Sequence, residues 1–285
     1  MKLFDIFKKK EKNDEPVNNP SELLAVKLFF VEEPKIDDDK IERSLKKRFK
    51  NIGFPDVDDL KNNARQYFFK DYEVEFKEGK MPVQGTIFIP DNEGIEIEEL
   101  ETSFHQSWNW REAESVIRTC KFEILLTDMM SRNLDYKLRL EFFQKFVASI
   151  VEVMNPKAIW ISNGEKLMNR EDYLDCFGRS EYQNLNGFMN VRLFNIQESN
   201  GEMIMDTLGL NSLGLPDFEI KFREFDPSII AGLLFNYGSY IYDEGVVIEN
   251  GNTIQGIEEN QKWKCYFKES LIEPKRIIIE IENGG

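Results

Sequence analysis

The stretch 207–219 constrains the fold of this chain more than any other, because it places two glycines and a proline between apolar segments. Gly209 and Gly214 can adopt positive φ at little cost, so they indicate turns or close backbone approaches. Pro216 has a restricted φ and favours an extended conformation in the residue before it. The pattern predicts a turn between two strands.

The segments on both sides of this turn have strand patterns. Residues 202–208 form a short apolar run, and residues 218–222 alternate apolar with charged side chains, as in a half-buried strand. Loops normally run over the surface, so a turn this apolar is expected to pack beneath other parts of the chain. Its leucines are Leu208, Leu210, Leu213 and Leu215. The turn is either a buried structural loop or a pocket wall, and in the second case Thr207, Asp217 and Glu219 face a ligand or partner.

The composition sets wide limits on the function. The chain has 285 residues, of which 41% are hydrophobic, enough for one large domain or two smaller ones. Its 37 basic and 52 acidic side chains give a formal net charge of −15. This balance argues against a nucleic-acid binder, which needs a basic surface for phosphates, and favours solubility or a basic protein partner.

The sequence contains no familiar catalytic or metal-binding motif. Cys120, Cys176 and Cys265 are far apart in the sequence, so their spacing matches no zinc-binding or redox motif. Sparse cysteines are typical of a reducing cytoplasm. A histidine-based triad or metal site would depend on His105, the single histidine. Patterns such as HExxH, GxSxG, the P-loop and GxGxxG are absent. We therefore predict a cytoplasmic protein that is a binder rather than an enzyme, with no cofactor and no metal.

The N-terminal part is predicted to be a small α+β subdomain over residues 21–100. A charged leader, residues 1–20, precedes it, lacks the apolar run of a signal peptide and is too short for strong membrane binding. A strand at 23–31 is followed by a helix capped by Asp37 or Asp38, and two further strands form a hairpin around residues 78–82. No segment approaches the length of a membrane-spanning helix.

Residues 101–285 are predicted to form a second α+β subdomain that carries the turn. Apolar residues at helical spacing predict a long helix at 136–154 between strands at 122–127 and 158–162, as in a crossover unit. A short helix containing Leu167 and another helix starting at Asp226–Pro227 follow. Strands are expected at 190–196, 246–248, 263–267 and 276–281. The overall class is α+β, with mixed sheets, packed helices and an arrangement consistent with two β-α-β-β halves.

Two further groups of residues are candidates for a binding site. Trp108 and Trp110, with His105 beside them, either line a pocket or attach the linker to a sheet. Asp128 ends a strand of the crossover unit, a position where ligands often bind, although Asp also suits the following turn. Arg139 on the long helix is expected to pair with Asp128 or Asp135.

The acids around the turn are a third group. Asp206, Asp217 and Glu219 could bind a cation or serve as acid and base, although neighbouring acids are expected by chance in a chain this acidic. A carboxylate-based enzyme or a small-ligand binder at this turn is therefore the alternative to a binding protein.

The same residues carry a resemblance to a known family. The pattern Thr207-x-Gly209-Leu210, then Gly214-x-Pro216-Asp217-x-Glu219, resembles a bacterial domain-of-unknown-function family. Its upstream features are similar to Trp108 and Trp110, to Asp128-Met129 and to Arg139. The turn is also similar to Suppressor-of-Fused-like domains, a superfamily that in bacteria is associated with immunity proteins against polymorphic toxins.

The resemblance and the composition together predict the function. They indicate a cytoplasmic protein-binding module, in its most specific form an immunity-type inhibitor that holds a basic, toxin-like protein. The resemblance implies no catalytic residues. The candidate binding residues are Trp108, Trp110, Asp128, Arg139, Thr207, Asp217 and Glu219. Oligomeric state is not predicted, and membrane contact through the leader is not expected.

Overall fold

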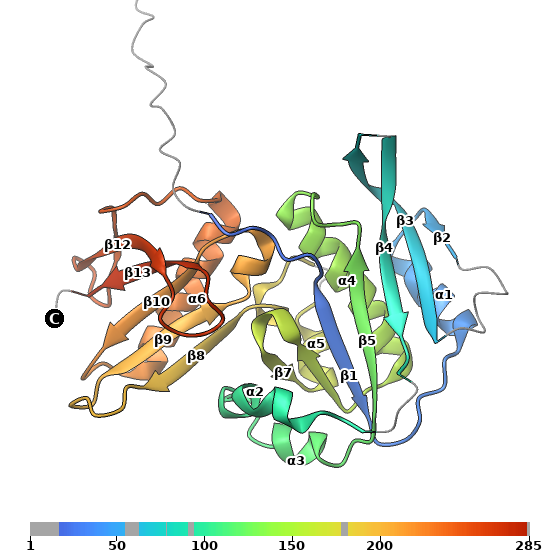
Figure 1. The fold of residues 1–285 in the computed structure, drawn as a ribbon, viewed down its shortest axis with the longest axis horizontal. Helices are drawn as coiled ribbons and strands as arrows, with labels where there is room; N and C mark the ends of the chain where they lie inside the picture. The colour runs from blue at the N-terminus through green and yellow to red at the C-terminus, as the bar shows by residue number, and fades with distance from the viewer. Residues whose placement is uncertain (1–16, 55–62, 78, 91–93, 178–181, 284–285) are drawn as a thin grey trace, which may run out of the picture.

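The chain folds around two β-sheets placed side by side (Figure 1). A computed structural model describes residues 17–54, 63–77, 79–90, 94–177 and 182–283. Helices pack on both sheets, so the predicted α+β class is confirmed. Most of the charged leader lies outside the described residues.

The first sheet contains seven strands, each antiparallel to its neighbours. Their order is β2-β3-β4-β5-β1-β6-β7. The bounds are β1 Ala25–Phe30, β2 Ile52–Gly53, β3 Ala64–Phe76, β4 Gly79–Phe88, β5 Phe122–Met129, β6 Ala158–Ile161 and β7 Lys166–Met168. The first strand of the chain thus lies between β5 and β6, which makes those two strands parallel to each other, as the crossover unit predicted.

Two helices cover one face of this sheet. Helix α1, Asp38–Arg48, is capped by the Asp37 side chain, and α4, Tyr136–Met154, is capped by Asp135. The rings of Phe142 and Phe146 on α4 pack against aromatic side chains of β3. The opposite face receives short helices only over β1, β6 and β7. These are α2, Glu101–His105, and α3, Ala113–Ile117, which pack on a separate small apolar cluster.

The second sheet is mixed, with the order β11-β12-β13-β10-β9-β8. Its strands are β8 Asn190–Asn195, β9 Met203–Leu208, β10 Asp217–Phe222, β11 Thr253–Gln255, β12 Lys262–Glu269 and β13 Ile277–Glu282. Strands β10 and β13 are parallel, and the other neighbours are antiparallel. Helix α6, Pro227–Glu244, begins after the N-cap Asp226 and packs on β9 and β10. Helix α5, Arg170–Asp175, lies beside α4.

An extended segment, residues 17–24, joins the two sheets, and we call it the strap. The side chain of Asn18 donates to the carbonyls of Leu215, in the turn before β10, and of Ile277, in β13, and it accepts from the Ile277 amide. The Ser21 amide then donates to the Ser212 carbonyl, 3.0 Å away. Beyond this point the strap continues into β1 of the first sheet (Figure 1).

Several expected boundaries differ from the structure. The division between the sheets lies between β7 and β8 rather than near residue 100, because β5, β6 and β7 pair with N-terminal strands. Leu167 belongs to strand β7 and not to a helix. Residues 246–248 form no strand, and β11 takes that place in the sheet. Strand β10 is almost fully buried rather than half-buried, because it lies between two strands and beneath α6.

Candidate functional site

The turn at 207–219 is buried, as its leucines predicted. Leu208, Leu210, Leu213 and Leu215 are at most 5% exposed. Residues Leu210–Leu213 form a short 3-10 helix between Gly209 and Gly214, whose φ angles are 132° and 85°. A Cβ atom on Gly214 would lie 3.0 Å from the Pro20 ring of the strap. Both glycines therefore hold positive φ, as predicted, and Gly214 also allows the strap to approach.

Asp217 holds this turn together from inside. Its carboxylate accepts hydrogen bonds from the Thr207 hydroxyl at 2.9 Å and from the Leu210 and Asn211 amides at 3.2 Å. The Thr207 hydroxyl oxygen in turn accepts from the Phe218 amide. Asp217 and Thr207 are both 0% exposed. Both candidate residues thus bind the chain's own backbone, and neither reaches solvent in this conformation.

Two arginines complete a buried ionic cluster around Asp217. Arg276 lies 3.1 Å from Asp217 and 2.7 Å from Asp206, and Arg192 forms two contacts with Asp206, of 3.0 and 2.6 Å. A further guanidinium nitrogen of Arg192 lies 2.7 Å from Glu165, which belongs to the loop before β7. The cluster therefore links the second sheet to the first.

The electrostatics of this cluster favour a structural role. Burial raises the pKa of Asp217, while Arg276 and the hydrogen bonds from Thr207 and Asn211 act in the opposite direction. Buried charges are stable only when they are paired and hydrogen bonded, and these are. Because these side chains are buried, a substrate could not reach them in this conformation. The geometry therefore does not support the alternative of acid and base catalysis at the turn.

Glu219 lies two residues after Asp217 in β10, on the same face of the strand, and is 2% exposed. Its carboxylate accepts from the Leu271 amide at 3.0 Å. Burial raises its pKa, and the hydrogen bond from Leu271 opposes this. The residue thus fastens the loop between β12 and β13, at the edge of the same cluster.

Asp128 and Arg139 form a second buried pair, which holds the strap. Arg139 Nε lies 2.7 Å from Asp128 Oδ2, and the two side chains are 0–1% exposed. Arg139 also donates to the Ser21 and Glu22 carbonyls, at 2.9 and 3.3 Å. Asp128 accepts from the Leu24 amide. The sequence left Asp128 or Asp135 open as the partner of Arg139, and the structure selects Asp128.

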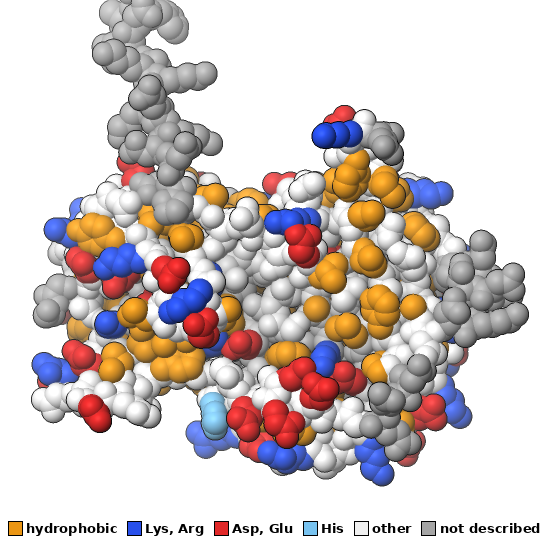
Figure 2. Space-filling view, in the orientation of Figure 1, with side chains coloured by type: hydrophobic (Ala, Val, Ile, Leu, Met, Phe, Trp, Pro, Cys, Tyr) orange, Lys and Arg blue, Asp and Glu red, His pale blue; other side chains and the backbone are white. Residues whose placement is uncertain are grey.

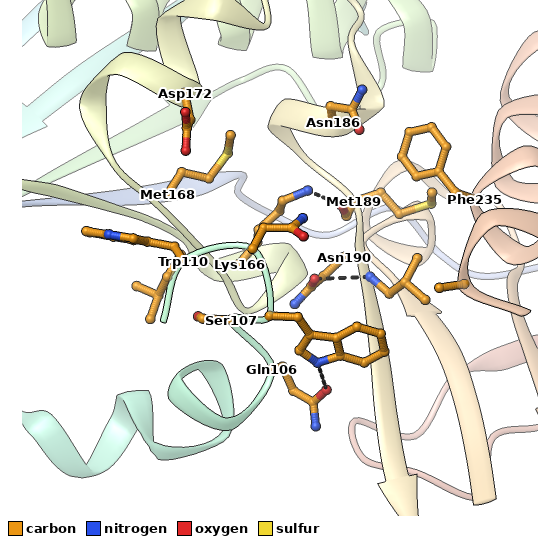
Figure 3. A pocket seen from close by; sticks show the side chains of 15 residues that line it. Gln106, Ser107, Trp110, Lys166, Met168, Asp172, Asn186, Met189, Asn190 and Phe235 are labelled. Atoms are coloured by element: carbon orange, nitrogen blue, oxygen red, sulfur yellow. Dashed lines mark hydrogen bonds between the residues drawn. The ribbon is translucent and has the colours of Figure 1, made fainter. Parts of the chain in front are cut away.

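Trp108 and Trp110 both line a hollow between the sheets, and Figure 3 shows Trp110 in its wall. The hollow has a volume of about 360 Å³, and its walls come from the segment 106–110, β7, the start of β8 and helix α6. Gln106 connects this segment to the second sheet. Its side-chain amide donates to the Leu193 carbonyl at 2.9 Å and accepts from the Leu193 backbone N–H at 2.8 Å. Gln106 also accepts from the Trp108 indole at 3.2 Å. His105, in contrast, is exposed and does not line this hollow.

One face of the first sheet carries no covering helix among the described residues, and we call it the open face. It lies on β3, β4 and β5, opposite α1 and α4. Its side chains, placed by strand register, are Ala64, Gln66, Phe68, Gln84, Thr86, Phe88, Leu125, Thr127 and Met129. None of them is charged. Figure 2 shows this face as a region of hydrophobic and neutral side chains.

The open face has a floor and a rim. Thr86 and Thr127 are 3% and 2% exposed between larger neighbours, whereas Phe88 is 39% exposed. Charged side chains of both signs lie at its borders: Glu73, Glu75 and Lys80 on the β3–β4 hairpin, and Glu99 and Glu123, which both pair with Lys27. The sequence analysis missed this surface. The alternation of β4 and β5 was a usable signal, since neutral residues recur on one face of each strand.

The structure offers little for a metal site or a membrane span. Across the described residues, no group of three or more His, Cys, Asp or Glu side chains could hold a metal ion. Within the same residues, no helix combines the length and hydrophobicity needed to cross a bilayer. The three cysteines are free thiols.

Comparison with known proteins identifies one related family. The family described as Domain of unknown function (DUF4261) matches residues 206–282, which cover the ionic cluster, α6 and most of the second sheet. Neither the comparison with curated proteins nor that with solved structures found a match.

Proposed function

We propose that this chain is a cytoplasmic protein-binding module that holds a basic protein on its open face. The observation that carries the proposal is a sheet face of uncharged side chains, with four acids among the charges at its borders, in a chain with a net charge of −15. Uncovered, uncharged surface that includes apolar side chains is typical of interaction sites, and the excess of negative charge speeds the encounter with a basic partner.

The charges of this surface select the partner class. Apolar residues at the centre supply most of the affinity of an interface, while charges at its border act on the association rate and on specificity. A basic protein with a neutral, apolar contact region fits both features. In its specific form, the proposal is an immunity-type inhibitor that blocks a basic toxin by covering it, as the resemblance of the turn to Suppressor-of-Fused-like domains suggests.

The buried clusters contribute to this function indirectly. Asp128 and Arg139 lie beneath the first sheet at the end of β5 and fix the strap that leads into β1. Asp217 and its arginines fix the other end of the strap through the turn. In this proposal these candidate residues hold the strands of the open face in register and do not contact the partner.

Capture from a lysate of the source organism tests the proposal. The double variant Phe88→Lys, Leu125→Lys places positive charge on the open face, and the control Ile229→Lys alters a side chain of similar exposure on α6. A basic protein retained in stoichiometric amounts is purified, and its dissociation constants for the three forms are measured. We expect the double variant to bind at least ~10-fold more weakly and the control to bind as the wild type does.

Two outcomes contradict the proposal. If the captured protein binds the double variant as tightly as the wild type, the open face is not its docking surface. If the wild type retains no basic protein in stoichiometric amounts, the proposed partner class is wrong. Circular dichroism of each variant establishes that the comparison is made between folded proteins.

A further inference from the structure

The hollow between the sheets contains a lysine without a counter-ion, a feature that the proposed function does not use. Among the residues that the structure describes, Lys166 is the only Lys or Arg side chain in the wall of the hollow. Its ammonium group lies 3.0 Å from the Met189 carbonyl, to which it donates (Figure 3). Over the described residues, no carboxylate lies within ion-pair distance of it. An ammonium group has three donors, so two remain for another molecule.

The lack of an ion pair at Lys166 is unusual for a lysine in such a setting. Burial lowers the pKa of Lys166 to about 8. Lysine side chains normally reach solvent or pair with an acid, because removing the charge from water costs free energy. In a chain with 15 more acids than basic residues, a lysine that lines a hollow together with Asp172 and yet forms no ion pair is the opposite of what chance favours.

The other walls favour a flat apolar group. Trp108, Trp110, Phe235 and Met168 supply aromatic and thioether surface from three different parts of the chain. The amides of Gln106 and Asn190 are already engaged by backbone groups, so they keep the walls in place rather than offering hydrogen bonds. The volume of about 360 Å³ lies at the small end of the range of ligand pockets.

We propose that this hollow binds a small molecule that carries one carboxylate beside a flat aromatic ring, with Lys166 pairing with the carboxylate and the tryptophans contacting the ring. The ligand supplies the negative charge that the protein leaves out. This pairing also favours the charged form of the lysine, which burial opposes. The inference concerns a site separate from the open face and does not depend on the proposed function.

A single carboxylate fits this site better than a phosphate. Phosphate sites usually combine several donors, such as arginine forks, backbone amides at a helix N-terminus or more than one cation. Here one ammonium group is available, and Asp172 in the wall adds negative charge that a dianion would meet. A monoanion with an apolar body matches both the single cation and the aromatic walls.

The tryptophan side chains provide the assay. Trp108 and Trp110 line the hollow, whereas Trp160 and Trp263 are at most 9% exposed and lie in the apolar cores. In the protein labelled with ¹⁵N-tryptophan, the indole N–H signals of all four can be followed during titration with phenylacetate. Phenylacetamide, which has the same ring without the charge, is the matched control ligand.

We expect phenylacetate to shift the Trp108 and Trp110 signals in a saturable way and to leave the other two in place. Lys166→Met should weaken phenylacetate binding at least ~10-fold, because a hydrogen-bonded charge pair is lost. Lys264→Met, which removes an exposed lysine on β12, should bind as the wild type does. Phenylacetamide should bind the wild type at least ~10-fold more weakly than phenylacetate.

Three results overturn the proposal. The first is the absence of shifts at Trp108 and Trp110 up to ~20 mM phenylacetate, a concentration at which even a weak site would fill. The second is equal affinity of the wild type for phenylacetate and phenylacetamide. The third is unchanged phenylacetate binding by Lys166→Met. Unmoved Trp160 and Trp263 signals in the variant establish that it is folded, and the comparison of the two ligands on the wild type requires no variant.

Discussion

Replacing Arg276 by methionine should destabilise the fold more than almost any other single change, because it removes the cation between two buried acids. Arg276 contacts Asp217 at 3.1 Å and Asp206 at 2.7 Å, and it donates to the backbone carbonyls of Thr207 and Pro274 at 2.8 Å. Methionine has a similar length but offers no donor. The variant leaves Asp217 without a cation at 0% exposure.

The expected loss follows from that geometry. Breaking a buried pair by removing one partner costs about 3–5 kcal/mol. A typical domain is stable by about 5–15 kcal/mol, so the variant should lose a third or more of its stability. The matched control is Arg118→Met, which removes an exposed pair with Glu114 on α3 and should cost at most ~0.5 kcal/mol.

Urea unfolding followed by tryptophan fluorescence measures both variants. The midpoint for Arg276→Met should fall far below that of the wild type, while Arg118→Met should unfold close to it. The pH dependence adds a second criterion. Burial already raises the pKa of Asp217, and Arg276 opposes this, so the variant should raise that pKa further.

The direction of the pH effect follows from proton linkage. A carboxyl group with a raised pKa binds its proton more tightly in the folded state, so acidification stabilises the fold relative to the unfolded chain. The stability deficit of Arg276→Met should therefore shrink as the pH falls from neutral toward the ordinary carboxyl pKa, and Asp217→Asn should partly restore the variant at neutral pH. A deficit equal to that of Arg118→Met, or one that grows on acidification, would refute the reasoning.

Three further changes test other parts of the fold. Gly85→Ala places a Cβ atom 2.9 Å from the buried ring of Phe146, so urea unfolding should show a loss of about 1–3 kcal/mol, and wild-type stability would mean that the ring moves freely. Asn18→Ala removes three hydrogen bonds that fix the strap, so hydrogen exchange should accelerate in residues 18–24, and unchanged exchange would show that the strap is held by other contacts. In the native protein a thiol reagent should modify Cys176 before Cys265, which is 1% exposed and whose thiol pKa burial raises to about 11, and the reverse order would contradict this placement.

The local features of the turn were predictable because they depend on residues next to one another. Gly209 and Gly214 adopt positive φ since they lack a Cβ atom, and the leucines between them are buried, as their hydrophobicity predicted. The cap at Asp226, with Pro227 in the first turn of α6, follows from the same kind of short-range chemistry. The turn and its two flanking strands were therefore predicted correctly, and the binding role of its candidate residues stays a prediction.

Their partners could not be predicted, because each lies far away in the sequence. Arg276 stands 59 residues from Asp217 and gave no signal beyond its place at the start of a predicted strand. Lys166 was not among the predicted site residues, since its lack of an ion pair can be recognised only from the positions of the acids around it in the folded chain. The division of the strands between the two sheets was also not predictable, because the pairing of β1 with both β5 and β6 is a long-range choice.

The sequence by itself determined the local elements of this protein: the α+β class, the glycine-dependent turn, the helix caps and the excess of negative charge. These depend on backbone sterics, periodicity and composition, which are properties of neighbouring residues. Only the tertiary structure decided which acids are neutralised within the fold, which sheet face stays open and where one lysine lies without an ion pair. Those outcomes depend on distances between residues far apart in the chain, because a charge or an apolar face acquires its role from what packs against it.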